Sequence, residues 1–412
     1  MPLKPIQPQP YKLFNKVQNY DWGTKNDNAF IPKFLGVEPV KDLPYAELWI
    51  GAHPKAPSEI EIEGTRYPLN LVIDNFPLEV LGNRVSKKYN GKFPFLLKVL
   101  SAARALSIQI HPNKKQAVIL HAKDPKNYPD DNDKPEIAIA LDSLTAIVGF
   151  RPAKQIKEIF IKCPELKDFI GGNNYEMLID TDDENKLKEN IEIVYKTIMN
   201  EADDKEKLES VINKLVEKFS AQSHLTLEEE QFLIQQKLYG CDVGLLSFFF
   251  FNIIQLKPGQ AFFTAAGVPH AYIKGNIIEC MANSDNVVRA GLTNKFKDVD
   301  TLLEIMNYSF GEIEIINKQQ KLDEVVFKTT AAEFEVSSYM KNTGSDHKLV
   351  TKDKPIVVLI ENGKMKVEWI SGEEKKYATF GKGDSFLLPA VLPELFLCMK
   401  ENSKYYVVAI PD

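Results

Sequence analysis

The sequence is poor in cysteine, has no excess of positive charge and contains no long apolar run. Its four cysteines, Cys163, Cys241, Cys280 and Cys398, lie far apart, without the spacing of a disulfide framework or a zinc finger. They predict reduced thiols in a cytoplasmic protein. The formal net charge of −6, with Lys and Glu interspersed, offers no broad basic surface, so we expect no nucleic-acid partner.

The chain also lacks the signals of secretion and of membrane insertion. Residues 1–8 contain no apolar core of the kind that a signal peptide needs. The apolar run at residues 245–251 is too short to span a bilayer, and it predicts a strand buried on both faces. We therefore expect a cytoplasmic protein with no membrane partner.

Length and local patterns predict more than one domain. A chain of 412 residues exceeds one ordinary compact domain. Residues 1–150 contain short β-branched and aromatic segments between turn residues, which favours antiparallel sheet. From residue 153 to 240 apolar side chains recur at helical spacing, and Thr226 with Glu229 fits a capping box. Strand signals return at residue 242.

A short glycine-containing pattern indicates the kind of sheet. Residues 259–270 follow the order G-x5-A-x-G-x-x-H, which resembles the second cupin motif with Ala265 in place of Pro. Residues 383–389 repeat its first half, but Val391 and Glu394 replace the Gly and the His. We expect a mostly β fold with an α-helical insertion and two cupin-like (jelly-roll) β-barrels, the second of which lacks metal ligands.

These patterns predict three domains. One cupin-like domain is discontinuous and comprises residues 1–152 and 242–320. The helical domain comprises residues 153–241. The C-terminal cupin-like domain comprises residues 321–412 and has no metal ligands.

Three segments offer side chains of the types that bind metals. Gln109 and His111 stand two residues apart, so on a strand they face the same side. Glu136 begins a second alternating segment, and His270 lies in a Gly-Pro turn. Four N or O ligands converging from three strands would form a divalent-metal site of the zinc type.

Here the chain resembles a known family, the type I mannose-6-phosphate isomerases (phosphomannose isomerases) of the cupin superfamily. The resemblance covers residues 1–150 and about 260–305, whereas the helical middle and the C-terminal region are similar only in general character. The motifs that carry it are YDWG (20–23), AELWIGAHP (46–54), PFLLKVLS (94–101), SIQIHP (107–112), DKPE (133–136), GVPHAY (267–272) and NSDNVVRAGLT (283–293).

The resemblance implies a zinc-dependent isomerase. Its reaction interconverts mannose 6-phosphate and fructose 6-phosphate by proton transfer through an enediol, which feeds GDP-mannose and mannosylation pathways. It implies one Zn²⁺ per chain held by Gln109, His111, Glu136 and His270, although cobalt or manganese suits the same ligands. The expected partner is a small sugar phosphate, and the expected state is a monomer.

Four residues are candidates for catalysis: the resemblance places Arg289 at the active site, and Glu279, Lys134 and Tyr272 are candidates from their positions near the predicted ligands. Glu279 follows His270 on one predicted strand, and Lys134 precedes Glu136 by two residues, so both are candidates for the base and the choice stays open. Tyr272 either hydrogen-bonds substrate or packs. Arg289 either helps to open the sugar ring or steadies charge in the site, or it forms an exposed salt bridge.

Five further residues are expected to bind substrate. Ser107 and Lys295 match the phosphate-binding pattern of the family, and Asp285, Lys98 and Trp22 are expected at the edge of the site. The chain has Asn294 where the family has Pro, which frees backbone φ in the loop that carries Lys295.

Two other functions fit parts of the pattern. His111, His270 and Glu136 could supply the two-His-one-carboxylate set of an iron oxygenase. A sensor of sugar phosphates without catalysis is the second alternative. Gln109 and the segment around Arg289 argue against the oxygenase, and the complete ligand set argues against the sensor.

Overall fold

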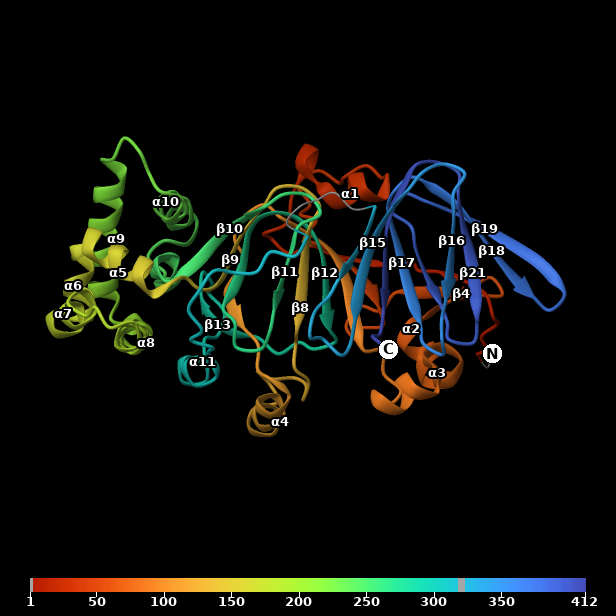
Figure 1. The fold of residues 1–412 in the computed structure, drawn as a ribbon, viewed down its shortest axis with the longest axis horizontal. Coiled ribbons are helices and arrows are strands. Elements are labelled where there is room, and N and C mark those ends of the chain that lie inside the picture. Colours follow the sequence, from red (N-terminus) through yellow and green to blue (C-terminus); the bar gives the residue numbers. More distant parts are fainter. Residues whose placement is uncertain (1–2, 318–322) are drawn as a thin grey trace.

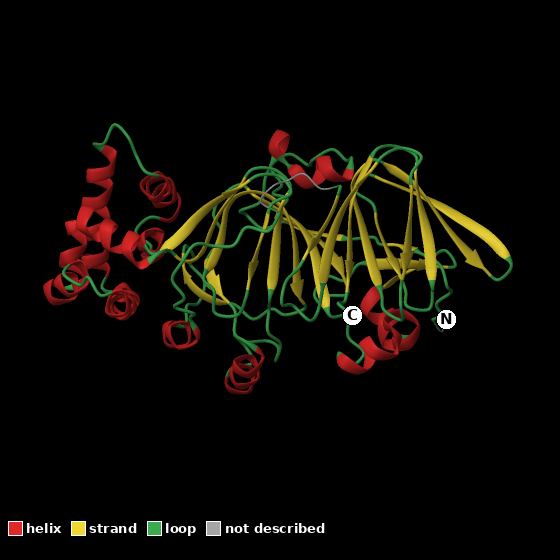
Figure 2. Cartoon of the chain, in the orientation of Figure 1, coloured by secondary structure: helices red, strands yellow, loops and turns green. Residues whose placement is uncertain are grey.

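The structure, a computed structural model, describes residues 3–317 and 323–412. Three regions lie in a row along the ribbon (Figure 1): helices α5 (Ala153–Lys162) to α10 (Leu227–Tyr239), strands around β12 (His270–Ala282), and strands around β17 (Ile356–Asn362). Figure 2 shows helices gathered at one end and strands across the rest. The structure is a mixed fold of sheets and helices: the predicted combination of strands with helices is confirmed, but helices hold as large a share of the described residues as strands, so the prediction of a mostly β chain is wrong. The predicted boundary between residues 320 and 321 lies outside the described residues.

Strand β12 is the centre of the middle region. It pairs antiparallel with β6 (Phe95–Ala102), β7 (Ile108–Ile110), β8 (Glu136–Ala140) and β9 (Leu144–Phe150) within a 10-stranded sheet. The sheet is completed by β2 (Lys16–Gln18), β3 (Glu47–Gly51), β10 (Phe251–Leu256), β11 (Ala261–Thr264) and β13 (Val288–Gly291).

This pairing does not close the middle sheet. Its strands run in the order β10-β9-β12-β6-β3-β2, with β8, β11, β7 and β13 branching from that path. The prediction of a closed barrel is therefore wrong for this sheet, because the sheet has edge strands.

The prediction of strands throughout residues 1–150 is also wrong in part. Four helices lie there: α1 (Phe30–Leu35), α2 (Leu69–Asn75), α3 (Pro77–Lys88) and α4 (Lys114–Lys123). Local signals favour them, since a proline opens α3 and a capping box of Asn113 and Gln116 opens α4. The remaining short elements are β1 (Tyr11–Lys12), η1 (Asn26–Asn28), β4 (Glu59–Ile62) and β5 (Thr65–Pro68).

The helical end of the molecule is built as its periodicity predicts. The capping box at α10 is confirmed, because the side chains of Thr226 and Glu229 each accept a hydrogen bond from the backbone N–H of the other. Between α5 and α10 lie η2 (Pro164–Leu166), α6 (Lys167–Ile170), α7 (Gly172–Ile179), α8 (Glu184–Asn200), η3 (Glu201–Asp203) and α9 (Lys205–Ser220).

The apolar run after α10 differs from its prediction. Residues 243–249 form a buried 3-10 helix, η4 (Val243–Phe249), and the chain enters β10 only at Phe251. Asp242 begins this turn by accepting a hydrogen bond from the Gly244 N–H at 2.7 Å. A short run that is apolar on all sides has no periodicity to separate a strand from a helix.

The C-terminal region consists of two sheets packed face to face. One has the order β1-β20-β17-β22-β15-β14 and the other β16-β21-β18-β19. Val358 and Phe386 of the first share an apolar core with Val367 and Leu395 of the second. The elements not yet given are β14 (Glu324–Phe327), β15 (Glu335–Lys341), β16 (Asp346–Val350), β18 (Lys364–Ser371), β19 (Glu374–Gly381), β20 (Ser385–Leu388), β21 (Glu394–Met399) and β22 (Ser403–Ala409). Helix α11 (Val299–Ile305) lies beside β13 in the middle region.

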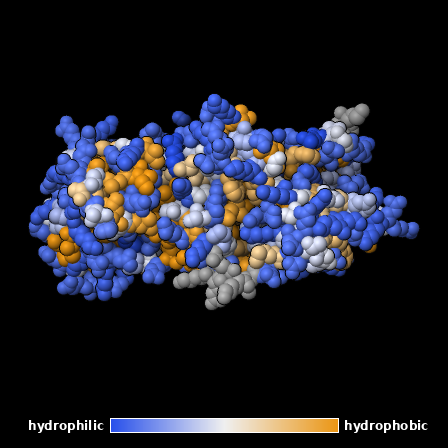
Figure 3. All heavy atoms as spheres, turned by 90° about the horizontal axis from the view of Figure 1, so that it is seen from above, coloured by the Kyte–Doolittle hydropathy of each residue, from blue (hydrophilic) through white to orange (hydrophobic). Residues whose placement is uncertain are grey.

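The surface agrees with the composition. The face in Figure 3 is mostly hydrophilic, and apolar residues gather toward its helical end. Within the described residues, no helix has the length and apolar character that crossing a bilayer requires.

Candidate active site

Strand register brings the predicted metal ligands together. Gln109 of β7 lies opposite His270 of β12 on one side and opposite Arg289 of β13 on the other. Glu136 of β8 lies opposite Met281, further along β12. Because directly opposed residues of paired strands share a face, Gln109, His270 and Arg289 lie on one face of the sheet.

Three of the four predicted ligands converge closely. One ligand atom each of His111, Glu136 and His270 lies within 4.8 Å of the other two, and these side chains are 1–2 % exposed. His111 Nε2 lies 3.4 Å from one carboxylate oxygen of Glu136, and His270 Nε2 lies 3.1 Å from the other. Among the described residues, this is the one such group of His, Cys, Asp or Glu that could hold a metal.

The other nitrogen of each imidazole fixes the tautomer. His111 Nδ1 lies 2.7 Å from the carbonyl oxygen of Asn286, and His270 Nδ1 lies 2.9 Å from that of Val268. A carbonyl only accepts, so each Nδ1 carries the proton in the neutral ring and each Nε2 presents a lone pair.

These lone pairs face a carboxylate without a proton between them. His111 Nε2, His270 Nε2 and one Glu136 oxygen are buried and have no hydrogen-bond partner, although they lie within salt-bridge distance of one another. Leaving buried acceptors unpaired costs free energy. A divalent cation would satisfy all three, so the residues present fit a zinc ion.

Charge and burial keep the ligands deprotonated. Burial, reinforced by the nearby Lys134 ammonium, lowers the pKa of His111 to about 4. Burial raises the pKa of the Glu136 carboxyl, but Lys134 and then His111 outweigh this and hold that pKa well below its usual range. A neutral imidazole and an ionised carboxylate are the forms that bind a metal.

Lys134 contacts this centre directly. Its Nζ lies 3.1 Å from Glu136 Oε1, and the residue is 7 % exposed. Arg289 is half-buried, and burial lowers the pKa of its guanidinium.

A second polar cluster lies on the same face of β12. Glu279 accepts hydrogen bonds from Lys98 Nζ at 2.9 Å and from the Tyr272 hydroxyl at 2.7 Å, one on each carboxylate oxygen. Burial lowers the pKa of Lys98, but Glu279 and Glu47 outweigh it and the net shift is upward. Lys98 is therefore charged at neutral pH.

Two contributors to the site were missed by the sequence reasoning. Glu47 is buried, lies 3.7 Å from Lys98 Nζ and accepts a hydrogen bond from the Trp49 indole. An acidic residue at the start of an apolar strand was the available signal. Asn286 acts on His111 through its backbone carbonyl, which no side-chain pattern reveals.

The five predicted substrate-binding residues are less tightly grouped. Lys98 belongs to the second cluster, and Asp285 pairs with Lys55 at 2.8 Å and with His53 at 3.4 Å. Trp22 is half-buried against the apolar cluster that contains Tyr272.

The remaining two lie outside these clusters. Ser107 is half-buried just before β7, and Lys295 is exposed beyond β13. Within the described part of the chain, neither side chain forms a hydrogen bond or an ion pair with the residues above.

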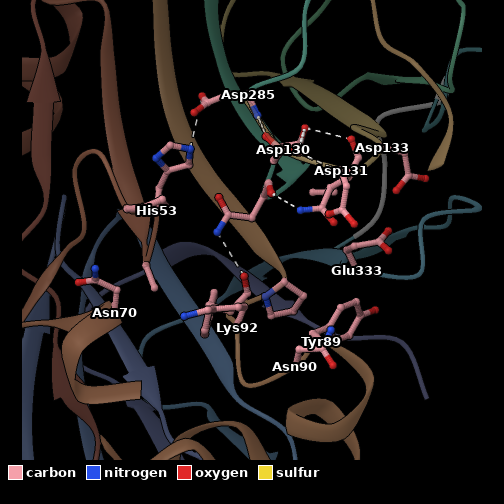
Figure 4. A pocket seen from close by; sticks show the side chains of 18 of the residues that line it. His53, Asn70, Tyr89, Asn90, Lys92, Asp130, Asp131, Asp133, Asp285 and Glu333 are labelled. Atoms are coloured by element: carbon pink, nitrogen blue, oxygen red, sulfur yellow. Dashed lines mark hydrogen bonds and ion pairs between the residues drawn. The ribbon is translucent and has the colours of Figure 1, made fainter. Parts of the chain in front are cut away.

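A cavity of about 880 Å³ lies next to this region, bordered by His53, Asp130, Asp285 and Glu333 (Figure 4). Its lining contains none of the three clustered ligands. It does, however, include residues 283–285, which lead into Asn286.

Comparison with known proteins identifies related sequences. Residues 11–153 match the family described as "Phosphomannose isomerase type I, catalytic domain". The chain is 34% identical over 425 residues to a mannose-6-phosphate isomerase of Ogataea parapolymorpha, covering 97% of this chain and 98% of that protein. It is 41% identical over 337 residues to a mannose-6-phosphate isomerase of Emericella nidulans, covering 74% of this chain and 71% of that one.

Solved structures share the overall fold of this chain. A mannose 6-phosphate isomerase bound with zinc and yttrium superimposes with a TM-score of 0.83 at 27% identity, covering 98% of this chain and 100% of that chain. A zinc-bound holo form of a mannose 6-phosphate isomerase gives a TM-score of 0.82 at the same identity and coverage.

Proposed function

The chain belongs to the type I mannose-6-phosphate isomerase family, and on that premise we propose how its residues interconvert D-mannose 6-phosphate and D-fructose 6-phosphate. The supporting observation is the pairing of two buried clusters on one sheet face. One presents unshared lone pairs from His111, Glu136 and His270, and the other holds Glu279 between Lys98 and Tyr272.

The metal ligands would be Gln109, His111, Glu136 and His270. Gln109 lies on β7 and His111 just beyond its end. Glu136 is at the start of β8, and His270 begins β12. When bound, zinc supplies a Lewis acid that stabilises the oxyanion developing on the substrate and needs no redox change. Cobalt or manganese would suit the same donors.

Glu279 is the base that we propose for moving the proton between C1 and C2. Lys98 donates to one of its oxygens and Tyr272 to the other, which favours an ionised, oriented carboxylate. Lys134 instead contacts Glu136, and we assign it to holding that ligand and neighbouring substrate oxygens.

The substrate's charged and polar groups need donors. We assign Arg289 to steadying charge in the site, because its guanidinium is always charged and lies opposite Gln109. Ser107 and Lys295 would bind the phosphate, with Asp285, Lys98 and Trp22 bordering the sugar. The exposure of Lys295 and the neighbouring Asn294 support a loop that adjusts when phosphate arrives.

The wider organisation is also a proposal. We assign residues 1–152 and 242–320 to a catalytic cupin-like domain, 153–241 to a helical domain and 321–412 to a second jelly roll without metal ligands. The two face-to-face sheets of the C-terminal region support the last assignment. We further propose a cytoplasmic monomer whose product feeds GDP-mannose synthesis.

Direct product detection tests this function. Purified zinc-loaded protein is mixed with mannose 6-phosphate, and fructose 6-phosphate is quantified by coupled assay while dissolved oxygen is followed. We expect product without oxygen uptake. Iron-dependent oxygen uptake without isomerisation would instead support a cupin oxygenase, and binding without turnover would support a sensor.

A further inference from the structure

The loop at residues 284–287 carries the Asn286 carbonyl, which orients the ring of His111. We propose that Asp130 is a positioning residue for the metal ligand His111, acting through the backbone of Asn286. The inference rests on the ligand set of the proposed function, and it concerns a residue that does not itself touch the ligands.

Asp130 gathers donors from two loops. Its Oδ1 accepts hydrogen bonds from the Ser284 hydroxyl at 2.8 Å, the Asn132 N–H at 3.0 Å and the Asn286 side-chain amide at 3.2 Å. Its Oδ2 accepts one from the Asp285 N–H at 2.8 Å. Figure 4 shows Asp130 beside Asp285 at the cavity.

The link between the loops is reciprocal. The Asn286 side-chain amide also donates to the carbonyls of Asp130 at 2.8 Å and of Asn132 at 2.9 Å. Residues 284–287 form neither helix nor strand, so no regular ladder fixes the Asn286 carbonyl. The Asp130 carboxylate supplies the fixed acceptors that replace such a ladder.

The Asn286 carbonyl is the acceptor for His111 Nδ1, at 2.7 Å, and both residues are buried. That contact selects the tautomer whose Nε2 faces Glu136 and sets the ring orientation. If the Asn286 carbonyl were not held in place, the His111 ring could rotate or adopt the other tautomer. Losing Asp130 should therefore weaken metal binding without removing a ligand.

The hydrogen bonds of Asp130 also help to position Glu136, the ligand that faces His111. The loop that contains Asp130 continues into Lys134 and then Glu136 at the start of β8. The hydrogen bonds between residues 130–132 and residues 284–286 thus fix the position of the Asn286 carbonyl relative to the strand that begins at Glu136. A negative charge in this loop is not sufficient for this role. The neighbouring Asp131 is exposed, and within the described residues its side chain pairs with Lys114 alone, at 3.3 Å.

The test measures zinc affinity apart from catalysis. Apo forms of the full chain are titrated with zinc against a competing chelator for the wild type, Asp130→Ala, Asp130→Asn and the matched control Asp131→Asn. We expect Asp130→Ala to bind zinc about 10- to 100-fold more weakly, as loss of a partner that orients a ligand does. Asp130→Asn keeps one acceptor oxygen and should lose less, and Asp131→Asn should match the wild type.

Folding is checked by thermal unfolding of each apo form. Should Asp130→Ala fail to fold, Asp130→Asn and Ser284→Ala carry the test, and their effects on zinc affinity should not add in the double variant because they break one network. Wild-type zinc affinity in folded Asp130 variants would overturn the inference while leaving isomerase activity intact. Weakened affinity in a chain that never isomerises mannose 6-phosphate would support the inference and refute the proposed function.

Discussion

His270 Nε2 lies 3.1 Å from a carboxylate oxygen of Glu136, and both atoms are buried without a hydrogen-bond partner. Two facing acceptors are stable in a protein interior only if something positive lies between them. With His111 Nε2 completing the set, the three side chains could hold a metal ion.

Replacing Glu136 by Gln should abolish tight zinc binding. The change removes the charged ligand and leaves Lys134 without its partner. We expect a loss of affinity beyond the roughly 10- to 100-fold that follows loss of an orienting partner. Metal content after dialysis measures it. Glu394→Gln is the control, because Glu394 stands where the C-terminal repeat lost its His, and it should leave zinc content unchanged.

Replacing Glu279 by Gln separates the base from its neighbours. The variant keeps the shape of the side chain but cannot accept the substrate proton. We expect kcat to fall by about 10²- to 10⁴-fold with little change in KM or zinc content. Tyr272→Phe should cost less, since it removes one hydrogen bond to the carboxylate. Unchanged kcat in Glu279→Gln, together with a collapse in zinc-loaded Lys134→Met, would transfer the base role to Lys134.

Glu333 should make stability fall as pH rises. Burial and then the charge of Asp133 raise the pKa of this carboxyl in the folded chain. The stability that it contributes is complete below its unfolded pKa, about 4.3, and is lost as pH rises through the folded value. Glu333→Gln should therefore unfold at a higher temperature than the wild type at pH 8, with the gain disappearing at pH 4.

The exposed Glu335 in β15 provides the matched control for that pH series. Glu335→Gln should change the unfolding temperature by the same small amount at both pH values. A stabilisation by Glu333→Gln that did not depend on pH would contradict the account.

We expect Arg151 to stabilise the junction between the middle sheet and the helical region. Its guanidinium donates to the Phe248 and Phe251 carbonyls and pairs with Glu228 at 2.7 Å. Arg151→Met leaves these acceptors unpaired, so we expect a loss of about 2 kcal/mol or more in the free energy of unfolding by urea. The exposed Lys154→Met in α5 should stay within about 0.5 kcal/mol of the wild type. Equal effects of the two changes would refute this role.

The sequence predicted the strand positions of the candidate ligands well because alternation is a local property. Gln109 on β7, Glu136 at the start of β8 and His270 at the start of β12 lie in segments whose period of two is visible in the chain. The capping box at α10 is local in the same way and was confirmed.

The remaining features depend on contacts between distant segments. The apolar run in η4 carries no period, and the closure of the middle sheet depends on which edges pair. The partners of the His rings are carbonyls of Asn286 and Val268, whose positions follow from loop packing rather than residue type. Helices α3 and α4, by contrast, had readable start signals that the strand interpretation overlooked.

The most direct test of the central claim is turnover of mannose 6-phosphate to fructose 6-phosphate before chelation, after chelation and after zinc is added back. We predict activity that is lost with the metal and restored by zinc while the protein stays folded. No turnover by folded protein with bound zinc would contradict the account.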